Sequence, residues 1–542
     1  MAEEERSARF EALCAALRRN DPDITEIPYV DLDDHAGHGR SLGEALQGNH
    51  YVSSMELFLS NWLDASEEDT GSIALLLQYI RESKAMRKIK LWSDEGPTAE
   101  PTAESVRAIL LAISDNPCIE ELGALFDINL VADSFALFLR TTKSLKTLVM
   151  MYHDFDGAAS PELVAEAIGA NQSLESLTFE SYSDSEFLES VLVRLGSHPR
   201  LCELKLECGD NASITQIHAL AKFLGSTTTL EHLELNHYAF VEESMEHLVD
   251  GLHSNQSLTK LALIRCKLNL LATNMFRTFM QSCETRSSIR ELRIGDSRNE
   301  TFQDSCTGPV LVSMLTTPDE NQGMVGSSIG SSLQFLELEI NSTGFCDAFA
   351  DAASRIRLPC LRIHNSFPVA YWDRLIRCLP RLVYLNTLKI SNMNEDVVRH
   401  SFVGALRNNG SLQHVAICSM ETTRVEDCFD EAESCIIASY CKRNEVLPKL
   451  VAEARQLLSL LPMLFQSAKQ ARRTAPNAIL IALLAVGDGI GPTPTQHPAG
   501  RRRCYNTQEA ECCDTDFAAG DDDSLTRPNK KSYGSRKPKK RM

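Results

Sequence analysis

One pentapeptide has the spacing of a catalytic motif. Residues 326–330 (GSSIG) match G-x-S-x-G, in which the central serine attacks a carbonyl carbon. That chemistry needs a strand before the serine, a helix after it, and an acid and a histidine further on. Here the pentapeptide leads into an apolar strand pattern at Leu333. Because the order of the elements is wrong, we interpret the match as coincidental and predict that the chain is not an enzyme.

A second group of side chains has the types that bind metals. Five of them crowd one short stretch: Asp31, Asp33, Asp34, His35 and His38. Oxygen and imidazole ligands at this density suit a divalent cation. Their spacing matches no known metal loop, and the neighbouring Gly37 and Gly39 indicate a turn. We found no phosphate loop, H-E-x-x-H or zinc spacing, and we expect a polar loop here and no cofactor.

The elements that carry these residues repeat along the chain. The motif L-x-x-L-x-L recurs, most clearly from Leu201, Leu230 and Leu258. With its first apolar residue as marker, the markers are Ile24, Val52, Met86, Ile119, Leu145, Leu174, Leu201, Leu230, Leu258, Ile289, Leu333, Leu358, Leu385 and Leu412. The steps between them are 28, 34, 33, 26, 29, 27, 29, 28, 31, 44, 25, 27 and 27 residues. Such a period predicts stacked units.

Each unit contains a strand pattern and a helix pattern. The last two leucines of the motif alternate, so they share the buried face of a short strand. The second half of each unit has apolar residues at helical spacing, as in Leu163, Val164, Ala167 and Ile168. We therefore predict an α/β solenoid of about 14 units over residues 20–425, with a parallel concave sheet and helices on the convex side.

These repeats resemble the ribonuclease-inhibitor-like class of leucine-rich repeat proteins. The resemblance depends on the step near 28 residues, the full helix in each unit, and the lead-in N-x-S-L that starts at Asn171, Asn255 and Asn409. That class usually has Asn or Cys eight residues after the marker, where it satisfies backbone groups of the turn. Only Cys266 and Asn341 meet this expectation here.

The regions outside the repeats have different patterns. Residues 1–19 predict an amphipathic capping helix, and residues 426–490 predict a helical C-terminal cap. The part from 451 to 490 is either an extension of this cap or a separate binding segment. The composition then shifts to Gly, Pro, Thr, Asp and Lys, and we predict disorder over residues 491–542.

Charge and cysteine usage limit the partners and the compartment. The net charge of −20 argues against nucleic acid, and no apolar stretch is long enough to span a membrane. The acidic first nine residues predict no signal peptide, and the 17 cysteines lack C-x-x-C, so we expect reduced thiols in an intracellular protein. The basic run from Lys530 to Arg541 is either a nuclear import signal or a solvated tail, so the location is cytoplasmic or nuclear.

Six N-x-S/T sequons occur along the chain. They begin at Asn171, Asn211, Asn255, Asn299, Asn341 and Asn409. Three of them coincide with the N-x-S-L lead-in of the repeat, and we interpret these three as structural turns rather than glycosylation sites.

The side chains between the leucines are expected to face outward from the sheet. The candidate partner-binding residues are Glu180, Glu203, Lys205, Glu207, His232, Glu234, Lys260, Glu291, Arg293, Phe335, Glu337 and Glu339. Seven of these outward residues are acids and three are Lys or Arg, so we predict a basic protein partner. Surface charge that only keeps an exposed sheet soluble is the alternative.

These observations predict non-catalytic protein binding through the concave sheet. Two alternatives use similar folds: a GTPase activator of the Ran type, and a substrate adaptor of a ubiquitin ligase. The first depends on an arginine near its N-terminal repeats, for which we found no matching motif, and residues 1–40 contain no recognisable F-box. The insertion from Thr316 to Ser332 is either a binding loop or a tolerated insertion.

Overall fold

A computed structural model describes most of the repeat region. The described residues are 2–30, 38–58, 70–92, 103–126, 128–152, 161–181, 186–208, 214–282, 289–295, 307–315, 333–339, 343–356, 358–364, 369–391, 396–418, 437–446, 448–452 and 455–456. All of them belong to the compact unit Met1–Gln456. The Asp31 to His35 stretch, the GSSIG pentapeptide, the Thr316 to Ser332 insertion and the basic run from Lys530 lie outside the described residues.

Fourteen strands form one sheet in which every neighbouring pair is parallel. In order across the sheet they are β1 (Glu26–Val30), β2 (Ser54–Phe58), β3 (Lys88–Trp92), β4 (Glu121–Leu125), β5 (Thr147–Tyr152), β6 (Ser176–Ser181), β7 (Glu203–Glu207), β8 (His232–Asn236), β10 (Lys260–Ile264), β12 (Glu291–Gly295), β13 (Phe335–Glu339), β14 (Cys360–His364), β15 (Thr387–Ser391) and β16 (His414–Cys418). Two short strands, β9 (Ala239–Phe240) and β11 (Lys267–Leu268), pair separately. The predicted fold class is therefore confirmed.

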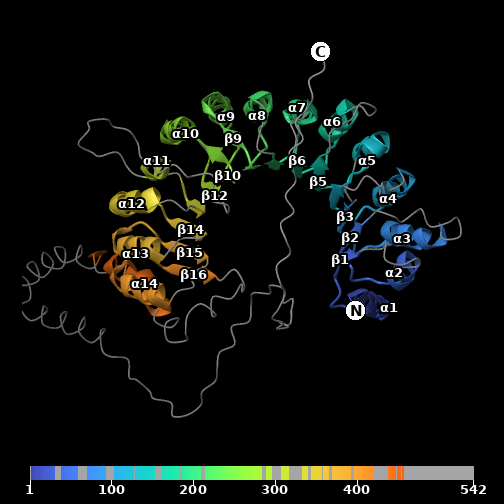
Figure 1. Ribbon diagram of the computed structural model, residues 1–542, viewed down its shortest axis with the longest axis horizontal. Helices are drawn as coiled ribbons and strands as arrows, with labels where there is room; N and C mark the ends of the chain where they lie inside the picture. The colour runs from blue at the N-terminus through green and yellow to red at the C-terminus, as the bar shows by residue number, and fades with distance from the viewer. Residues whose placement is uncertain are drawn as a thin grey trace, which may run out of the picture. The chain divides into compact units, whose positions relative to one another are not determined.

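Helices alternate with the strands along the chain. They are α1 (Ala2–Arg18), α2 (His38–Leu46), α3 (Thr70–Glu82), α4 (Ala103–Asp115), η2 (Ile128–Val131), α5 (Ala132–Thr141), α6 (Pro161–Ala170), α7 (Glu186–Leu195), α8 (Ile214–Ser226), α9 (Glu242–Ser254), α10 (Leu270–Ser282), α11 (Thr307–Met314), α12 (Thr343–Ala352), η6 (Ala353–Arg355), α13 (Val369–Cys378), η7 (Leu379–Arg381) and α14 (Asp396–Asn408). Within this unit the helices form the outer row and the strands the inner row (Figure 1). One face of the sheet, which we call the open face, is thus turned away from the helices.

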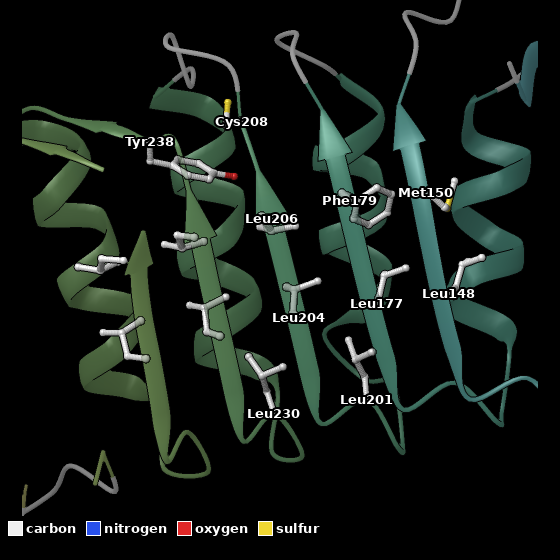
Figure 2. Packing of buried hydrophobic residues seen from close by; sticks show 14 of the residues in the cluster. Leu148, Met150, Leu177, Phe179, Leu201, Leu204, Leu206, Cys208, Leu230 and Tyr238 are labelled. Atoms are coloured by element: carbon white, nitrogen blue, oxygen red, sulfur yellow. The ribbon is translucent and has the colours of Figure 1, made fainter. Parts of the chain in front are cut away.

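The core lies between the sheet and the helices. In the parallel register Leu148, Leu177 and Leu204 stand side by side on β5, β6 and β7, and Figure 2 shows these side chains in the layer below the strands. Thirteen markers, from Val52 to Leu412, are at most 4 % exposed. Only Ile24 is partly buried, beside the first strand. Stacking therefore buries the apolar side of every unit, as the repeat pattern predicted.

A buried asparagine connects each of several units to the one before it. The Oδ1 atom of Asn255 accepts hydrogen bonds from the backbone N–H groups of Ser257 (3.0 Å) and Leu258 (2.7 Å). Its Nδ2 donates to the carbonyl oxygens of Leu224 (2.9 Å) and Thr227 (3.3 Å), which close the preceding helix. The same position, three residues before the marker, holds an asparagine that bonds both the turn and the preceding unit at Asn49, Asn116, Asn171 and Asn409.

The position eight residues after the marker is filled differently from one unit to the next. Cys266 does lie buried there and donates to the carbonyl of Leu235, but Tyr238 occupies the equivalent place one unit earlier and is 1 % exposed. The Tyr238 ring stacks on Phe240 at 5.8 Å between centroids. Buried backbone groups must find partners. In this turn some of them bond to the neighbouring unit, as the N–H of Lys267 does to the carbonyl of Tyr238, and an aromatic side chain fills the position.

The sequons at Asn171, Asn255 and Asn409 belong to this series. Their side chains are 2 %, 4 % and 1 % exposed, and each Nδ2 already donates to a backbone carbonyl. A glycan on that nitrogen would remove the bond and has no space. The interpretation of these three sequons as structural turns is confirmed, and the other three lie outside the described residues.

His198 takes the place of asparagine in one unit. Its Nδ1 accepts from the backbone N–H groups of Arg200 (3.3 Å) and Leu201 (3.0 Å), and Nε2 donates to the carbonyl of Asn171 (2.5 Å). Burial lowers the pKa of His198, although the bond to Asn171 raises it by a smaller amount. A proton on Nδ1 would replace the acceptor that two N–H groups need, so the folded protein holds this ring neutral.

We expect His198 to make the repeat region acid-sensitive. Its folded pKa lies below its ordinary value of 6.5, so the unfolded chain binds more protons and stability is lost as the pH falls below that value. Between pH 7.5 and 5.5 the contribution to the free energy of unfolding falls by at most about 1.4 kcal/mol. Urea unfolding of the wild type and of His198→Asn at both pH values measures it. An equal pH dependence in the two proteins would contradict this role.

Both ends of the repeat region carry additional helical residues. Cys14 and Leu17 of α1 are buried against the first unit. At the other end, in helical residues 437–446, Asn444 donates to the carbonyls of Asn409 (3.1 Å) and Leu412 (2.8 Å) and so continues the asparagine series after β16. None of the helices in the described part of the chain is long and apolar enough to cross a membrane.

Candidate protein-binding surface

Side chains alternate between the core and the open face in every clear strand. In β2, β3, β7 and β8 the first, third and fifth residues are half-buried and the second and fourth are buried. Glu203, Lys205 and Glu207 of β7 therefore face away from the helices, while Leu204 and Leu206 face the core. The strand faces are the ones that the repeat pattern predicted.

The parallel register arranges the open face in three rows. The first row contains Ser54, Lys88, Glu121, Thr147, Ser176, Glu203, His232, Lys260, Glu291, Phe335, Cys360, Thr387 and His414. The second contains Glu56, Lys90, Gly123, Val149, Thr178, Lys205, Glu234, Ala262, Arg293, Glu337, Arg362 and Lys389. The third contains Phe58, Trp92, Leu125, Glu180, Glu207, Asn236, Ile264, Gly295 and Glu339. All twelve predicted binding residues occupy these rows.

The expectation that the candidate glutamates Glu180, Glu203, Glu207, Glu234, Glu337 and Glu339 are exposed is wrong for Glu337. This residue is only 7 % exposed. Its carboxylate lies 3.0 Å from Nε of Arg293 on the strand before and 3.7 Å from Nη1 of Arg362 on the strand after. Two guanidinium groups cover it and compensate for the loss of water. Glu180, Glu203, Glu207 and Glu234 are half-buried, and the side chain of Glu339 lies outside the described residues.

Glu203 belongs to a network on the first two rows. Its carboxylate lies 3.0 Å from Nδ1 of His232 and 3.1 Å from Nζ of Lys205, and the Ser176 hydroxyl donates to it at 2.7 Å. The bond from His232, assisted by those from Ser176 and Lys205, lowers the pKa of Glu203 to about 2. This carboxylate is therefore already satisfied within the protein.

Other acids of the open face are paired in the same way. Lys260 lies 3.1 Å from Glu291, and Lys88 lies 2.7 Å from Glu121. The Nζ atom of Lys90 donates to Glu56 at 2.6 Å. Each pair joins neighbouring strands and contributes modestly because it is partly hydrated. The predicted excess of acids is thus reduced wherever a basic residue stands one strand away.

Three carboxylates of the open-face rows have no Lys or Arg of the described residues within salt-bridge distance: Glu180, Glu207 and Glu234. We call them the central carboxylates. Burial and the nearby charge of Glu207 raise the pKa of Glu180. Asn236 donates from Nδ2 to Glu234 at 3.1 Å, while its own Oδ1 is buried and accepts no hydrogen bond in the described structure. The β6–β8 part of the open face therefore presents mainly acceptors.

Two polar residues beside the third row were not predicted. His237 and Arg265 follow β8 and β10 with φ angles of 63° and 52°, in the left-handed region. The Nε2 atom of His237 lies 3.2 Å from Nη1 of Arg265 and 3.7 Å from Oε1 of Glu207. Residues other than glycine seldom adopt this conformation. No glycine or asparagine at these positions indicates the turn, so the sequence contains little signal for it.

The N-terminal strands extend the surface beyond the predicted set. Glu56, Lys88, Lys90 and Glu121 lie on the open face in the same register as the predicted residues. The markers Val52, Met86 and Ile119 could have predicted these four residues, because the outward positions of a strand follow its marker at a fixed spacing. The candidate surface thus starts at β2.

The described residues contain no group of three or more His, Cys, Asp or Glu that could hold a metal ion. Architecture and surface together define the chain as a repeat protein with strand–helix units and one long parallel sheet. No family model matches the chain, and neither does any curated protein.

Proposed function

We propose that the chain is a leucine-rich repeat protein of the ribonuclease-inhibitor-like class that binds a protein partner on its open face without catalysing a reaction. The repeat step, the full helix in each unit and the N-x-S-L turn support this class. The observation that carries the binding role is the open face itself, where the parallel strands from β2 onward hold three rows in which charged and polar side chains predominate. A rigid surface of this size suits a large partner.

A photo-crosslinking amino acid at one position on each side of the solenoid tests this proposal. Thr178 lies half-buried in the second row on β6, and Leu137 is 62 % exposed on the outer helix α5. We expect a discrete protein adduct from position 178 of the full chain in cells and none from position 137. Mass spectrometry of that adduct identifies the partner. Adducts from position 137 alone would overturn the proposal.

The main alternative is a GTPase activator of the Ran type. It predicts that small GTPases hydrolyse GTP faster when this chain is present, whereas our proposal predicts no acceleration. Single-turnover hydrolysis measured with and without the chain distinguishes the two. An acceleration that is lost when an arginine of the first units is replaced would favour the activator.

A further inference from the structure

We propose that the open face of β6–β8 docks a basic segment of the protein partner, rich in Lys or Arg, on the central carboxylates. This inference rests on the proposed function and specifies where and what that surface binds. The three strands expose four carboxylates in the rows, Glu180, Glu203, Glu207 and Glu234, and one lysine, Lys205. Charge complementarity therefore favours a cationic occupant.

The ion pairs of the protein decide which of these carboxylates is free to bind. Lys205 and His232 both contact Glu203, which leaves the central carboxylates without an ion pair to any Lys or Arg of the described residues; Lys90 acts on Glu180 only from beyond ion-pair distance. Arg293 and Arg362 are likewise committed to Glu337. His237 lies 3.7 Å from Glu207. Among the described side chains of the rows, the negative charge without a Lys or Arg partner is thus concentrated on β6–β8.

The chemistry of this patch fits guanidinium or ammonium groups. Its accessible groups without a basic partner are the central carboxylates, which accept hydrogen bonds. Arg and Lys side chains carry only donors. A cation between Glu180 and Glu207 would also relieve the repulsion that raises the pKa of Glu180. Half-buried carboxylates form stronger charge-assisted bonds than fully solvated ones.

The spacing of the strands indicates the form of the segment. Neighbouring strands are about 4.8 Å apart, so Glu180 on β6 and Glu234 on β8 stand on strands about 10 Å apart. Alternate side chains of an extended peptide share one face and repeat every ~7 Å. A segment with basic residues at alternate positions therefore places two or three cations over the central carboxylates.

Binding of a designed peptide to the full chain tests the inference. The probe is a fluorescent hexapeptide with arginine at alternate positions and serine between them, and anisotropy measures its affinity. One variant, which we call the central variant, carries Glu180→Gln, Glu207→Gln and Glu234→Gln. The matched control carries Glu56→Gln, Glu121→Gln and Glu291→Gln, which remove the same charge from paired positions of the same face. Circular dichroism verifies that both variants are folded.

We expect the central variant to bind the peptide about ten-fold more weakly than the wild type and the control variant to bind within about two-fold of it. The wild-type affinity should fall as salt rises from 50 to 300 mM, since the contact is electrostatic. Equal losses in the two variants would show attraction by net charge alone and would overturn the inference, as would no binding by the wild type. The crosslink from position 178 separates the two proposals. If it identifies a partner that the central variant binds as tightly as the wild type does, the proposed function stands and this inference is wrong.

Discussion

Replacement of Asn409 by alanine is expected to lower the free energy of unfolding by about 3 kcal/mol, because it leaves buried donors and an acceptor without partners. Asn409 is 1 % exposed. Its Oδ1 accepts from the backbone N–H groups of Ser411 (2.9 Å) and Leu412 (2.8 Å), and its Nδ2 donates to the carbonyl of Leu379 (2.6 Å). Alanine provides none of these bonds, and the site is too enclosed for bulk water to replace them.

Asn408 provides a matched control for this prediction. It is the last residue of α14 and is exposed, one position before Asn409. The change Asn408→Ala should alter the free energy of unfolding by less than about 0.5 kcal/mol. Urea unfolding followed by circular dichroism compares the two variants, and hydrogen exchange should show faster opening of β16 only in Asn409→Ala. Equal effects at the two positions would contradict a structural role for the asparagine series.

The second large effect is expected at Gly251, where two outer helices approach closely. A Cβ atom at this position of α9 would lie 2.7 Å from Cα and 2.8 Å from the carbonyl oxygen of Ala221 on α8. These are backbone atoms, so the clash can be relieved only by moving one helix away from the other. Gly251→Ala should therefore lower the free energy of unfolding by about 2 kcal/mol despite the better helix propensity of alanine.

Gly404 in α14 separates the clash from the effect of helix propensity. A Cβ atom there meets nothing within 4 Å. Gly404→Ala should raise the free energy of unfolding by about 0.5 kcal/mol, since alanine favours the helix more than glycine does. Opposite signs at the two glycines, measured by urea unfolding, are the expected result. A stabilising Gly251→Ala would mean that α8 and α9 lie further apart than described.

The sequence by itself determined the units, the strands and the two faces of the sheet. The reason is that these features depend on short-range alternation: Leu204 and Leu206 are buried, and Glu203 and Lys205 between them are half-buried. A strand with this pattern has only one face that it can bury. All outward positions follow from the markers. This includes the positions on β2 to β5, which the predicted set of partner-binding residues did not contain.

The hydrogen-bond partners of the position three residues before the marker depended on contacts between units. The N-x-S-L pattern identified Asn171, Asn255 and Asn409 as turn residues, and burial confirms this. It did not indicate that Asn116 and His198, in different local sequences, make the same kind of bond. Their carbonyl acceptors lie 27 to 36 residues earlier in the chain, so no local pattern reveals them.

Only the tertiary structure decided which charges of the open face remain free. The sequence counted acids and bases but could not pair them, because most pairs join neighbouring strands and Lys205 could contact several acids on its own strand and on the next. Lys205 binds Glu203, two arginines cover Glu337, and Glu180 and Glu207 meet no such partner among the described residues. Long side chains choose among several neighbours at similar distance, and small differences in geometry and hydration decide the outcome.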